Sequence, residues 1–575
     1  MLISGENTMD KKWVLADPIP EDCRTKLDRW QSEPVLQQLF WNRKLTSEEE
    51  AMGFVRYQMS HDADPHKLAD MTSAVERILA ALDTGQLIAI YGDYDVDGVT
   101  ATLLLKQGLE AYGAEVVYYI PDRHLEGYGI HSDVLKRFAE QGVDLVISVD
   151  CGISAFEEVQ QSNELGMDFI VTDHHQISSE LPEALAVINP NRPDCEYPEN
   201  ILSAVGISYK LVQALWSVKS PQNSHKPLSN FLDLVALGTV ADLAPLIGEN
   251  RYMVQAGLEI INTNPRLGIK ALLGVSRSSG FVSAQTIGFQ LGPRINAVGR
   301  IGNASRALSL LATKSDQEAV EIAQELEKYN RERQRMTRDM TSAALELSAK
   351  TYTTGESHIL FAEHEDFHNG LVGLVAARLC QEYYLPAVVG QRKEGYIIGS
   401  ARSISEFHIS NAFKDCSQLL EKYGGHAAAA GFTIKQENWT KFVEHLESIA
   451  ADTLKDVDLR PVLNIDAEVQ ASDITQRLVS QQSFFEPSGI ANPQPIFMWR
   501  GAHILSKRNV GRDDKHLKLK FEGGQNGSLD AIGFGLGDRY AELNEKADLV
   551  FALEINEWNG HTNEQLNVKD IRSSE

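Results

Sequence analysis

Three aspartates spaced two residues apart form the set of side chains best suited to chemistry. Asp93, Asp95 and Asp97 lie in the segment YGDYDVDGVT (91–100), directly after an apolar run. In an extended backbone, side chains two residues apart point to the same side. Three carboxylates gathered in this way repel one another strongly unless a multivalent cation neutralises them. The spacing therefore predicts a metal site, and Gly98 would permit a tight turn into the next helix.

Two blander interpretations of this segment are a solvated acidic loop and a fragment of an EF-hand calcium loop. The EF-hand pattern requires a Gly and then a Glu further along, and the continuation after Asp97 does not supply them. The solvated loop stays open on this segment alone. The metal site is favoured because the aspartates follow an expected strand, and ligand crevices of open α/β sheets lie at the carboxyl ends of strands.

Acidic and imidazole side chains also follow two further expected strands. Asp150 ends the run DLVISVD, and Asp173, His174 and His175 end the run DFIVTDHH. Because the carboxyl ends of parallel strands meet at one edge of a sheet, we expect these side chains to converge with the three aspartates. Asp242, in GTVADLAPL, is a fourth contributor that is, taken alone, as readily structural as functional.

The types of ligand indicate the metal. Hard carboxylate oxygens with one or two imidazoles suit Mn²⁺ or Mg²⁺ better than a thiolate-rich zinc site. A cluster this acidic could hold one ion or two, and two ions roughly 3.5–4 Å apart support in-line attack of water at phosphorus. The cluster therefore predicts metal-assisted hydrolysis of a phosphoester.

A sheet has to position these side chains, and the apolar pattern predicts one. Five short, β-rich apolar runs alternate with helical segments, at residues 87–91, 116–120, 144–149, 168–172 and 184–188. Near-continuous apolarity of this kind is typical of parallel strands covered by helices on both faces. An amphipathic helix is expected over 71–82, and 201–275 has a mostly helical pattern. The alternation predicts a doubly wound α/β domain.

The pattern changes twice beyond this domain. Residues 315–349 contain no Gly or Pro and predict one long helix that joins two lobes. A second α/β pattern follows, with strands over 358–362, 386–390 and 395–403 and helices over 370–384 and 411–423. From about residue 460, short strands with turn signals predict a small barrel of the OB-fold type, for example at 516–521, 529–535 and 548–556.

We therefore expect five parts along the chain. They are an N-terminal helical segment (1–70) with a helix start near Ser47, the doubly wound domain (71–275), an inter-lobe region with the long connecting helix (276–354), the second α/β domain (355–458) and the OB-fold-like β-barrel (459–575).

Composition limits the class of protein. The chain has 575 residues, of which 43% are hydrophobic, so wholesale disorder and fibrous classes are excluded. A net charge of −26 excludes a uniformly basic surface for nucleic acid but not local basic grooves. Five scattered cysteines without a CxxC pair argue against a disulfide framework and favour a reducing cytoplasm. No apolar run approaches the roughly 18 residues of a membrane span, so we expect a soluble, cytoplasmic protein.

Taken together, the motifs resemble those of the DHH phosphoesterase superfamily. DYDVDG (93–98), Asp150, TDHH (172–175) and Asp242 match its four motifs, and GGHAAAAGF (424–432) resembles the glycine-rich motif of its DHHA1 domain. With LGPRINAVGR, GSARS and the C-terminal barrel, the set is similar to the RecJ family of bacterial single-strand-specific 5′→3′ DNA exonucleases. The resemblance covers roughly residues 60–570.

The resemblance implies roles by matching position. The metal ligands would be Asp95, Asp97, Asp150, His174 and Asp242. Asp93 and Asp173 would complete the acidic cluster or orient its ligands, and His175 would contact the scissile phosphate. Tyr91 departs from the pattern, because DHH proteins often have a His at this position that can bind the metal. The departure leaves the ligand set of the second metal open.

A second set of residues would contact DNA. Phosphate contacts are implied for Arg123, Ser400, Arg402, Gly424, Gly425 and His426, because bare backbone N–H groups and guanidinium groups bind phosphate well. The alternatives are a plain tight turn for the glycine motif and a surface salt bridge for any single arginine. Residues that would line the DNA path are Arg294, Asn296 and Arg300, for which a structural role between lobes is equally open.

Positive charge is local in this acidic chain. The run RERQR (331–335) and Arg338 would lie on the long helix, either as a solvated face or in contact with the DNA backbone. In the barrel, basic residues surround strand-like sequence near Phe521, namely Lys507, Arg508, Arg512, Lys515, Lys518 and Lys520. OB-folds hold single strands in basic grooves with aromatic platforms. Aromatic residues in small barrels are more often core, so the prediction rests on the basic residues.

The placement of these residues together with the family resemblance implies a metal-dependent exonuclease, with Mn²⁺ or Mg²⁺, that degrades single-stranded DNA 5′→3′ to 5′-mononucleotides in DNA repair and recombination. One alternative is a DHH–DHHA1 oligoribonuclease or cyclic-dinucleotide phosphodiesterase, against which the residues after 460 argue. Another is a non-catalytic DNA-binding replication scaffold, in which the carboxylates would be eroded, whereas here they are intact. The resemblance also implies a monomer, with a single-strand-binding protein and a RecQ-type helicase as partners.

Overall fold

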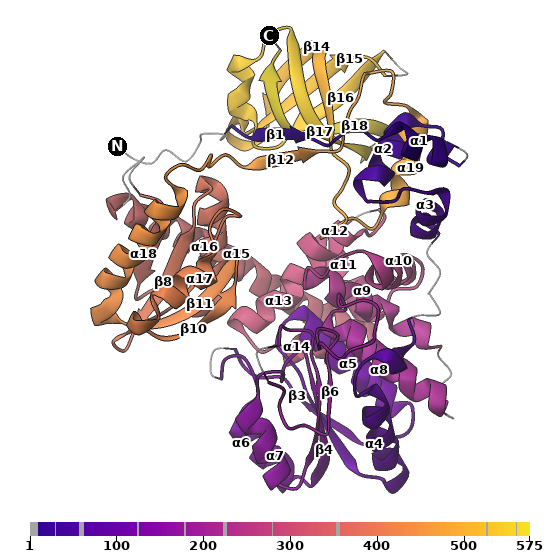
Figure 1. The fold of residues 1–575 in the computed structure, drawn as a ribbon, viewed down its shortest axis with the longest axis vertical. Helices are drawn as coiled ribbons and strands as arrows, with labels where there is room; N and C mark the ends of the chain where they lie inside the picture. Colours follow the sequence, from indigo (N-terminus) through magenta and orange to yellow (C-terminus); the bar gives the residue numbers. More distant parts are fainter. Residues whose placement is uncertain are drawn as a thin grey trace. The chain divides into compact units, whose positions relative to one another are not determined.

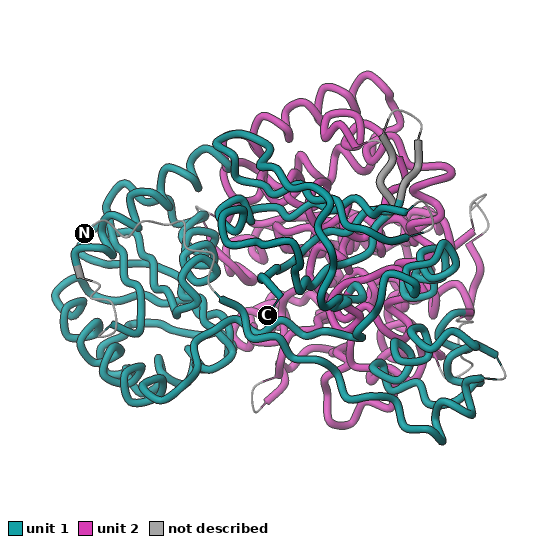
Figure 2. Tube along the Cα trace, turned by 90° about the horizontal axis from the view of Figure 1, so that it is seen from above, with its two compact units in different colours: residues 1–55, 334–485, 494–575 teal, residues 56–333, 486–493 magenta. Residues whose placement is uncertain are grey.

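Two compact units make up the chain in the computed structural model, and each draws on distant parts of the sequence (Figure 2). Unit 1 comprises residues 1–55, 334–485 and 494–575, and unit 2 comprises residues 56–333 and 486–493. The structure describes residues 10–574 apart from 29, 57–62, 124–125, 178–179, 222–226, 279, 352–356, 525–526 and 559–560. No helix within these described residues is both long and apolar enough to span a membrane.

Unit 2 is built on a five-stranded sheet in the order β3-β2-β4-β5-β6, and all neighbouring strands are parallel (Figure 1). The strands are β2 (Leu87–Tyr91), β3 (Val116–Tyr119), β4 (Val143–Val149), β5 (Asp168–Thr172) and β6 (Ala186–Ile188). All five were predicted, although β6 begins two residues later than expected. The parallel sheet is therefore confirmed.

Helices cover both faces of this sheet. Ile88 and Ile90 of β2 pack into one core with helices α4 (Met71–Thr84), α5 (Val96–Glu110) and α8 (Ala204–Val218). The alternate residues Ala89 and Tyr91 pack into the other core, with α6 (Ser132–Glu140) and α7 (Phe156–Glu164). Because successive side chains of a strand point to opposite faces, apolar residues at every position supply both cores. The doubly wound arrangement is confirmed.

The rest of unit 2 is helical. Its helices include α9 (Leu232–Ala241), α10 (Gly248–Thr263), α11 (Leu267–Ser276), α13 (Gly292–Ile301) and α14 (Ser305–Ala312). The long helix α15 (Asp316–Thr351) follows, and the boundary between the units falls within it, at residues 333 and 334. The prediction of one long connecting helix is confirmed.

Unit 1 contains the second α/β domain. Its sheet has the order β10-β11-β9-β8-β7, in which only β7 and β8 are parallel. The elements are β7 (Leu360–His364), α16 (Asn369–Tyr383), β8 (Ala387–Lys393), β9 (Tyr396–Arg402), α17 (Ile409–Asp415), β10 (Leu420–His426), β11 (Ala429–Lys435) and α18 (Trp439–Leu454).

The helix expected over 411–423 is wrong in its second half. Helix α17 ends at Asp415, and Leu420–His426 form strand β10, which pairs with β11. The stretch LLEKY has good helix propensity by itself. Pairing with a neighbouring strand outweighs that local preference, and the two glycines that follow oppose a longer helix.

The C-terminal part of unit 1 is a closed barrel. Strand β14 (Phe497–Val510) pairs with β15 (His516–Glu522) and also with β17 (Lys546–Trp558), and β16 (Ser528–Gly533) and β18 (His561–Ser573) complete the ring. A barrel of five strands is the OB-type architecture predicted from the sequence.

The N-terminal helices share the core of the barrel. Leu27 of α1 (Glu21–Asp28) and Phe40 of α2 (Pro34–Asn42) are fully buried in one cluster with Phe521 and Phe551. Helix α3 (Glu48–Val55) begins as predicted, because Ser47 accepts a hydrogen bond from the Glu50 backbone and the Glu50 carboxylate accepts one from that of Thr46. Strand β1 (Lys12–Leu15), which pairs with β12 (Val462–Ile465), was not predicted.

Candidate active site

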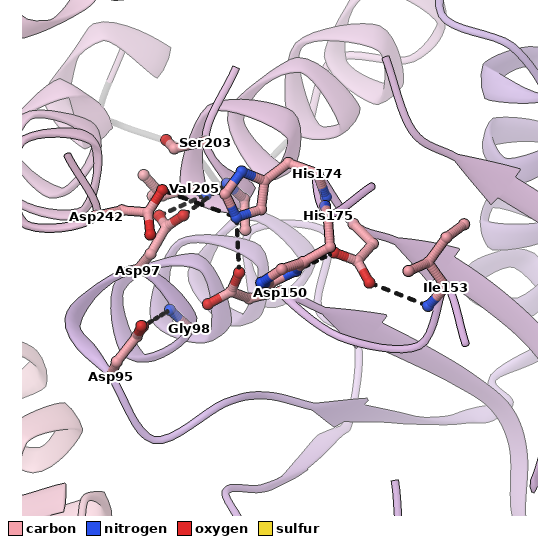
Figure 3. Close-up of polar contacts among 12 residues, drawn as sticks. Asp95, Asp97, Gly98, Asp150, Ile153, His174, His175, Ser203, Val205 and Asp242 are labelled. Carbon is pink, nitrogen blue, oxygen red and sulfur yellow. Dashed lines mark hydrogen bonds and ion pairs between the residues drawn. The ribbon is translucent and has the colours of Figure 1, made fainter. Parts of the chain in front are cut away.

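The segment that carries the three aspartates is a strand, a turn and a helix. Strand β2 ends at Tyr91, Asp95 is the N-cap of α5, and Asp97 lies in the first helical turn. The expectation of an extended backbone over 93–97 is therefore wrong. The Asp95 carboxylate accepts a hydrogen bond from the Gly98 backbone (3.0 Å), which starts the helix and reorients the side chains (Figure 3).

Gly98 lies inside the helix and not in a turn. A Cβ atom at this position would lie 2.6 Å from the carbonyl oxygen of Asp93, so any larger residue would push the two segments apart. The glycine is required for a close approach, which the sequence pattern could not distinguish from a turn.

Asp97 is held by the N-terminus of α8. Its two carboxylate oxygens accept hydrogen bonds from the backbones of Ala204 (2.7 Å) and Val205 (2.9 Å). The side chain is fully buried, and burial together with the nearby Asp95 raises the pKa of Asp97 to about 7. These N–H groups fix the orientation of Asp97 toward the other acidic groups (Figure 3).

Asp150 follows β4 in a strained conformation. Its φ is +64°, a region that non-glycine residues rarely adopt and that clusters at functional sites. One of its carboxylate oxygens lies 3.2 Å from Nε2 of His174, and Asp242 places an oxygen 3.8 Å from the same nitrogen. Asp242 is the C-cap of α9, so a helix end completes the group.

The His174–His175 pair is held by Asp173. One Asp173 oxygen accepts hydrogen bonds from the backbones of His174 (2.7 Å) and His175 (3.0 Å) and lies 2.7 Å from Nδ1 of His175. The other oxygen accepts one from the Ile153 backbone (3.0 Å). Burial alone would lower the pKa of His175, but Asp173 outweighs it and raises that pKa to about 9. Burial and the neighbouring His175 lower the pKa of His174 to about 4.

Two asparagines after β6 hold the same pair from the other side, and sequence reasoning missed them. Asn191 donates a hydrogen bond to the carbonyl of His174 (2.7 Å), and Asn189 donates one to that of His175 (2.9 Å). The Asn191 backbone in turn donates to the Asn189 side chain (2.8 Å). The only sequence signal for these asparagines was their position after β6, at the edge of the sheet where the carboxyl ends of β2, β4 and β5 also bring the cluster together.

Replacing Asn191 with alanine should lower the rate of phosphodiester hydrolysis about tenfold, because groups that orient metal ligands typically matter by that factor or more. The rate would be measured as a function of Mn²⁺ concentration. Asn163→Ala is the control, since the exposed side chain of Asn163 donates to the carbonyl of Glu183 (2.9 Å) near the end of α7, at the opposite edge of the sheet. Equal rates for the two variants would contradict the positioning role of Asn191.

The cluster offers three overlapping groups of ligands, each with atoms within 4.8 Å of one another. They are Asp150 with His174 and His175; Asp97 with His174 and Asp242; and Asp93 with Asp95 and Asp150. Burial followed by neighbouring carboxylates raises the pKa of Asp93, of Asp150 and, to about 9, of Asp242. Several buried carboxylates this close together repel one another, and a bound cation would neutralise their charge.

The donor atoms fit a divalent metal. In the described part of the chain, Oδ1 of Asp93 is buried and makes no hydrogen bond, and Oδ1 of Asp150 and Nε2 of His174 have only each other, as an ion pair at 3.2 Å, and the more distant Asp242. Buried polar groups are nearly always paired, so such atoms indicate a ligand that they bind. Carboxylate oxygens with imidazole nitrogen are suitable for Mn²⁺ or Mg²⁺.

A cavity of about 270 Å³ opens onto the cluster. Arg123, Asn296 and Arg300, all predicted to contact DNA, line it together with the carboxylates. Two tyrosines that sequence reasoning missed, Tyr94 and Tyr128, line it as well. The Arg123 guanidinium lies over the Tyr94 ring (4.9 Å), and the Tyr128 hydroxyl donates to the carbonyl of Asp150 (3.3 Å). Cations therefore face anions across a space that can hold a phosphodiester.

Two other residues lie elsewhere. Arg294 does not line the cavity; it pairs with Glu327 (2.8 Å) and donates to the carbonyl of Gln290 (2.7 Å). Both partners belong to unit 2, as Arg294 itself does, so these contacts do not join two lobes. Tyr91 is fully buried, and its hydroxyl donates to the carbonyl of Gly129 (3.1 Å), so it belongs to none of the three ligand groups.

The predicted phosphate contacts of the second α/β domain come together on adjacent strands. Arg402 of β9 and His426 of β10 both pair with Ala429 of β11, whereas Ser400 and Gly424 both pair with Gly431. Arg402 donates a hydrogen bond to the Ser400 hydroxyl (2.7 Å). Gly425 has a φ of +145°, and a Cβ atom there would lie 2.3 Å from the carbonyl oxygen of Ala429. The motif is thus a strand with a hairpin rather than an isolated tight turn.

The basic residues of the long helix and the barrel differ in their surroundings. On the helix, Arg331 pairs with Glu327 (2.6 Å) and Arg335 with Asp339 (3.0 Å), which is typical of a solvated face. In the barrel, Lys507 donates to backbone carbonyls, whereas Arg508 and Lys518 are cross-strand neighbours on the outer face. Phe521 is fully buried in the core, so it offers no stacking surface.

Comparison with known proteins identifies the domain types. The matching family models are described as the DHH family, N-terminal domain (residues 87–239), the DHHA1 domain (356–452) and the RecJ OB domain (465–570).

Full-length relatives and solved structures agree with these domains. The single-stranded-DNA-specific exonuclease RecJ of Bacillus subtilis is 35% identical over 98% of this chain and 71% of its own length, and that of Escherichia coli is 32% identical over 94% and 96%. The crystal structure of RecJ with Mn²⁺ from Thermus thermophilus superimposes with a TM-score of 0.84 at 27% identity, covering 98% of this chain and 80% of that one. The Mg²⁺ complex gives 0.77 at 26% identity, covering 98% and 79%.

Proposed function

The chain belongs to the RecJ family of single-stranded-DNA-specific exonucleases, and we propose that it degrades single-stranded DNA from the 5′ end, releasing 5′-mononucleotides. The observation that carries this proposal is the cavity in which Arg123 and Arg300 face the carboxylate cluster. A phosphodiester is anionic, so the guanidinium groups attract it, while the acidic cluster needs cations that the reaction can use.

We assign the roles at the cluster as follows. The metal ligands are Asp95, Asp97, Asp150, His174 and Asp242, with Asp93 completing the group around Asp95. Mn²⁺ or Mg²⁺ bound by these residues would supply Lewis-acid activation of water and would neutralise charge at phosphorus. Asp173 fixes the ring of His175 through Nδ1, which leaves Nε2 to contact a non-bridging oxygen of the scissile phosphate.

Residues around the cluster bind the substrate. Arg123 and Arg300 pair with phosphate oxygens in the cavity, and Asn296 holds the start of α5 by accepting a hydrogen bond from the Val96 backbone (3.2 Å). In the second α/β domain, Ser400, Arg402 and the Gly424–His426 strand form a further phosphate contact. The outer face of the barrel at Arg508 and Lys518 contacts the DNA backbone.

The five-part division of the chain, with boundaries near residues 71, 276, 355 and 459, belongs to the same proposal. The proposal also includes a cytoplasmic role in DNA repair and recombination. There, by family resemblance, a single-strand-binding protein and a RecQ-type helicase would present the substrate.

The test uses one oligonucleotide labelled at either end. With Mn²⁺ or Mg²⁺, the 5′-labelled strand should release a labelled mononucleotide at once, while the 3′-labelled strand shortens progressively. Immediate loss of the 3′ label would overturn the polarity. Cleavage restricted to strands a few nucleotides long would indicate an oligonucleotidase, and binding without cleavage in either metal would indicate a scaffold.

A further inference from the structure

A short turn from the C-terminal part of the chain completes the catalytic unit. Residues 486–493, here named the docked turn, belong to unit 2, whereas the chain immediately before and after them belongs to unit 1 (Figure 2). The catalytic unit thus contains one segment about 240 residues distant in sequence from the loop that it touches.

The docked turn forms hydrogen bonds with the loop between α9 and α10 and with the start of α10. The carbonyl of Ile490 accepts a hydrogen bond from the Leu246 backbone (2.8 Å), and the carbonyl of Glu486 accepts one from the buried guanidinium of Arg251 (2.7 Å). Gly489 lies against Leu246 so closely that a Cβ atom there would be 2.6 Å from Cδ1 of Leu246. Both the 243–247 loop and the start of α10 are therefore held.

The docked turn is itself rigid. Gly489 and Asn492 exchange two backbone hydrogen bonds, at 2.8 and 3.2 Å. The Asn492 side chain is fully buried and donates to the carbonyl of Pro487 (2.9 Å). Leaving a buried amide unpaired is unfavourable, so this hydrogen bond favours the observed shape of the turn.

The 243–247 loop, which the docked turn contacts, follows directly after Asp242 of the candidate metal site. Asp242 is the C-cap of α9, Leu243 follows with a φ of +61°, and Asn250 donates a hydrogen bond to the carbonyl of Pro245 (3.1 Å). The docked turn holds the next residue, Leu246, through the carbonyl of Ile490 (2.8 Å). We propose that the docked turn is a positioning element of the metal site, which fixes the 243–247 loop and through it the carboxylate of Asp242.

The proposal rests on the proposed role of Asp242 as a ligand. A docked turn that merely anchors the C-terminal part of the chain would leave the metal affinity unchanged. If the turn acts through Asp242, its disruption weakens metal binding, because the orientation of a ligand contributes to affinity.

The experiment measures Mn²⁺ binding to the full chain without substrate, by the loss of the electron paramagnetic resonance signal of free Mn²⁺. The variants Asn492→Ala and Gly489→Ala should bind Mn²⁺ about tenfold more weakly, the lower end of the effects of residues that support metal ligands. Asn163→Ala, which removes an exposed hydrogen bond to a backbone carbonyl at the opposite edge of the sheet, should bind as the unaltered chain does. Melting curves identify any variant that does not fold. If only one of the two docked-turn variants folds, that variant alone is enough to test the proposal.

A double-mutant cycle tests whether the docked turn affects Mn²⁺ binding through Asp242. In the background of Asp242→Asn, disruption of the docked turn should weaken Mn²⁺ binding no further, since the ligand that it positions is gone. Unchanged affinity in folded Asn492→Ala and Gly489→Ala variants would overturn the proposal, as would full additivity with Asp242→Asn. Mn²⁺ binding is read without DNA, so failure of the exonuclease assay leaves this measurement independent.

Discussion

Asp150→Asn should lower the rate of single-stranded DNA hydrolysis by at least about a thousandfold, because a catalytic metal contributes several kcal/mol of transition-state stabilisation. Asp150 is the carboxylate shared between ligand groups: it belongs to two of the three, one with Asp93 and Asp95 and the other with both histidines. Asparagine keeps the shape but loses the charge that the ions require. The rate would be measured at saturating Mn²⁺ on a 5′-labelled strand.

The same substitution should stabilise the metal-free protein. Burial and the neighbouring Asp95 and Asp97 raise the pKa of Asp150, which means that its charge is unfavourable there. Asparagine removes that charge and adopts the observed φ of +64° more readily than most residues. The melting temperature without metal should therefore rise while activity is lost, and the two opposite changes distinguish a functional site from a structural one.

Asp133→Asn is the matched control. Asp133 lies in α6, its side chain is 93% exposed, and its substitution should change neither the rate nor the melting temperature. An Asp150→Asn variant that retained a tenth of the normal rate would remove Asp150 from the proposed ligand set.

Chelation of divalent metal should abolish hydrolysis completely, and added Mn²⁺ or Mg²⁺ should restore it. The reason is that the described residues lining the cavity include no Ser, Thr, Cys or Lys, the usual covalent nucleophiles, whereas their carboxylates can hold a metal that activates water. Residual cleavage in excess chelator, after the metal has been removed by dialysis, would contradict the metal-dependent mechanism.

Metal should also stabilise unit 2 by mass action. A ligand that binds only the folded state adds about 2.7 kcal/mol at a concentration one hundred times its dissociation constant. Melting curves at increasing Mn²⁺ should therefore shift upward for the unaltered chain, and the shift should be much smaller for Asp150→Asn. A melting temperature that does not change with the Mn²⁺ concentration would mean that the cluster binds no metal.

The strands of unit 2, the polar side chains at their ends and the long helix could be predicted from the sequence alone. The strands of unit 2 follow from runs of apolar residues, because a strand buried on both faces needs an apolar side chain at every position. The carboxylates and histidines at the ends of these strands follow from spacing, because parallel strands bring their carboxyl ends to one edge. The long helix α15 follows from the absence of Gly and Pro over its length.

Contacts between distant segments were decided by the tertiary structure. The turn after Asp93 depends on the approach of Gly98 to a neighbouring backbone, and the strand β10 depends on its partner β11. The N-terminal helices enter the core of the barrel, although their apolar pattern alone fits any core. Asn191 reaches the His174 carbonyl, and the docked turn reaches Leu246, only because the tertiary structure brings these segments together. Periodicity records which face of an element is buried, whereas the partner that buries it is chosen by the shape and pairing of the whole fold.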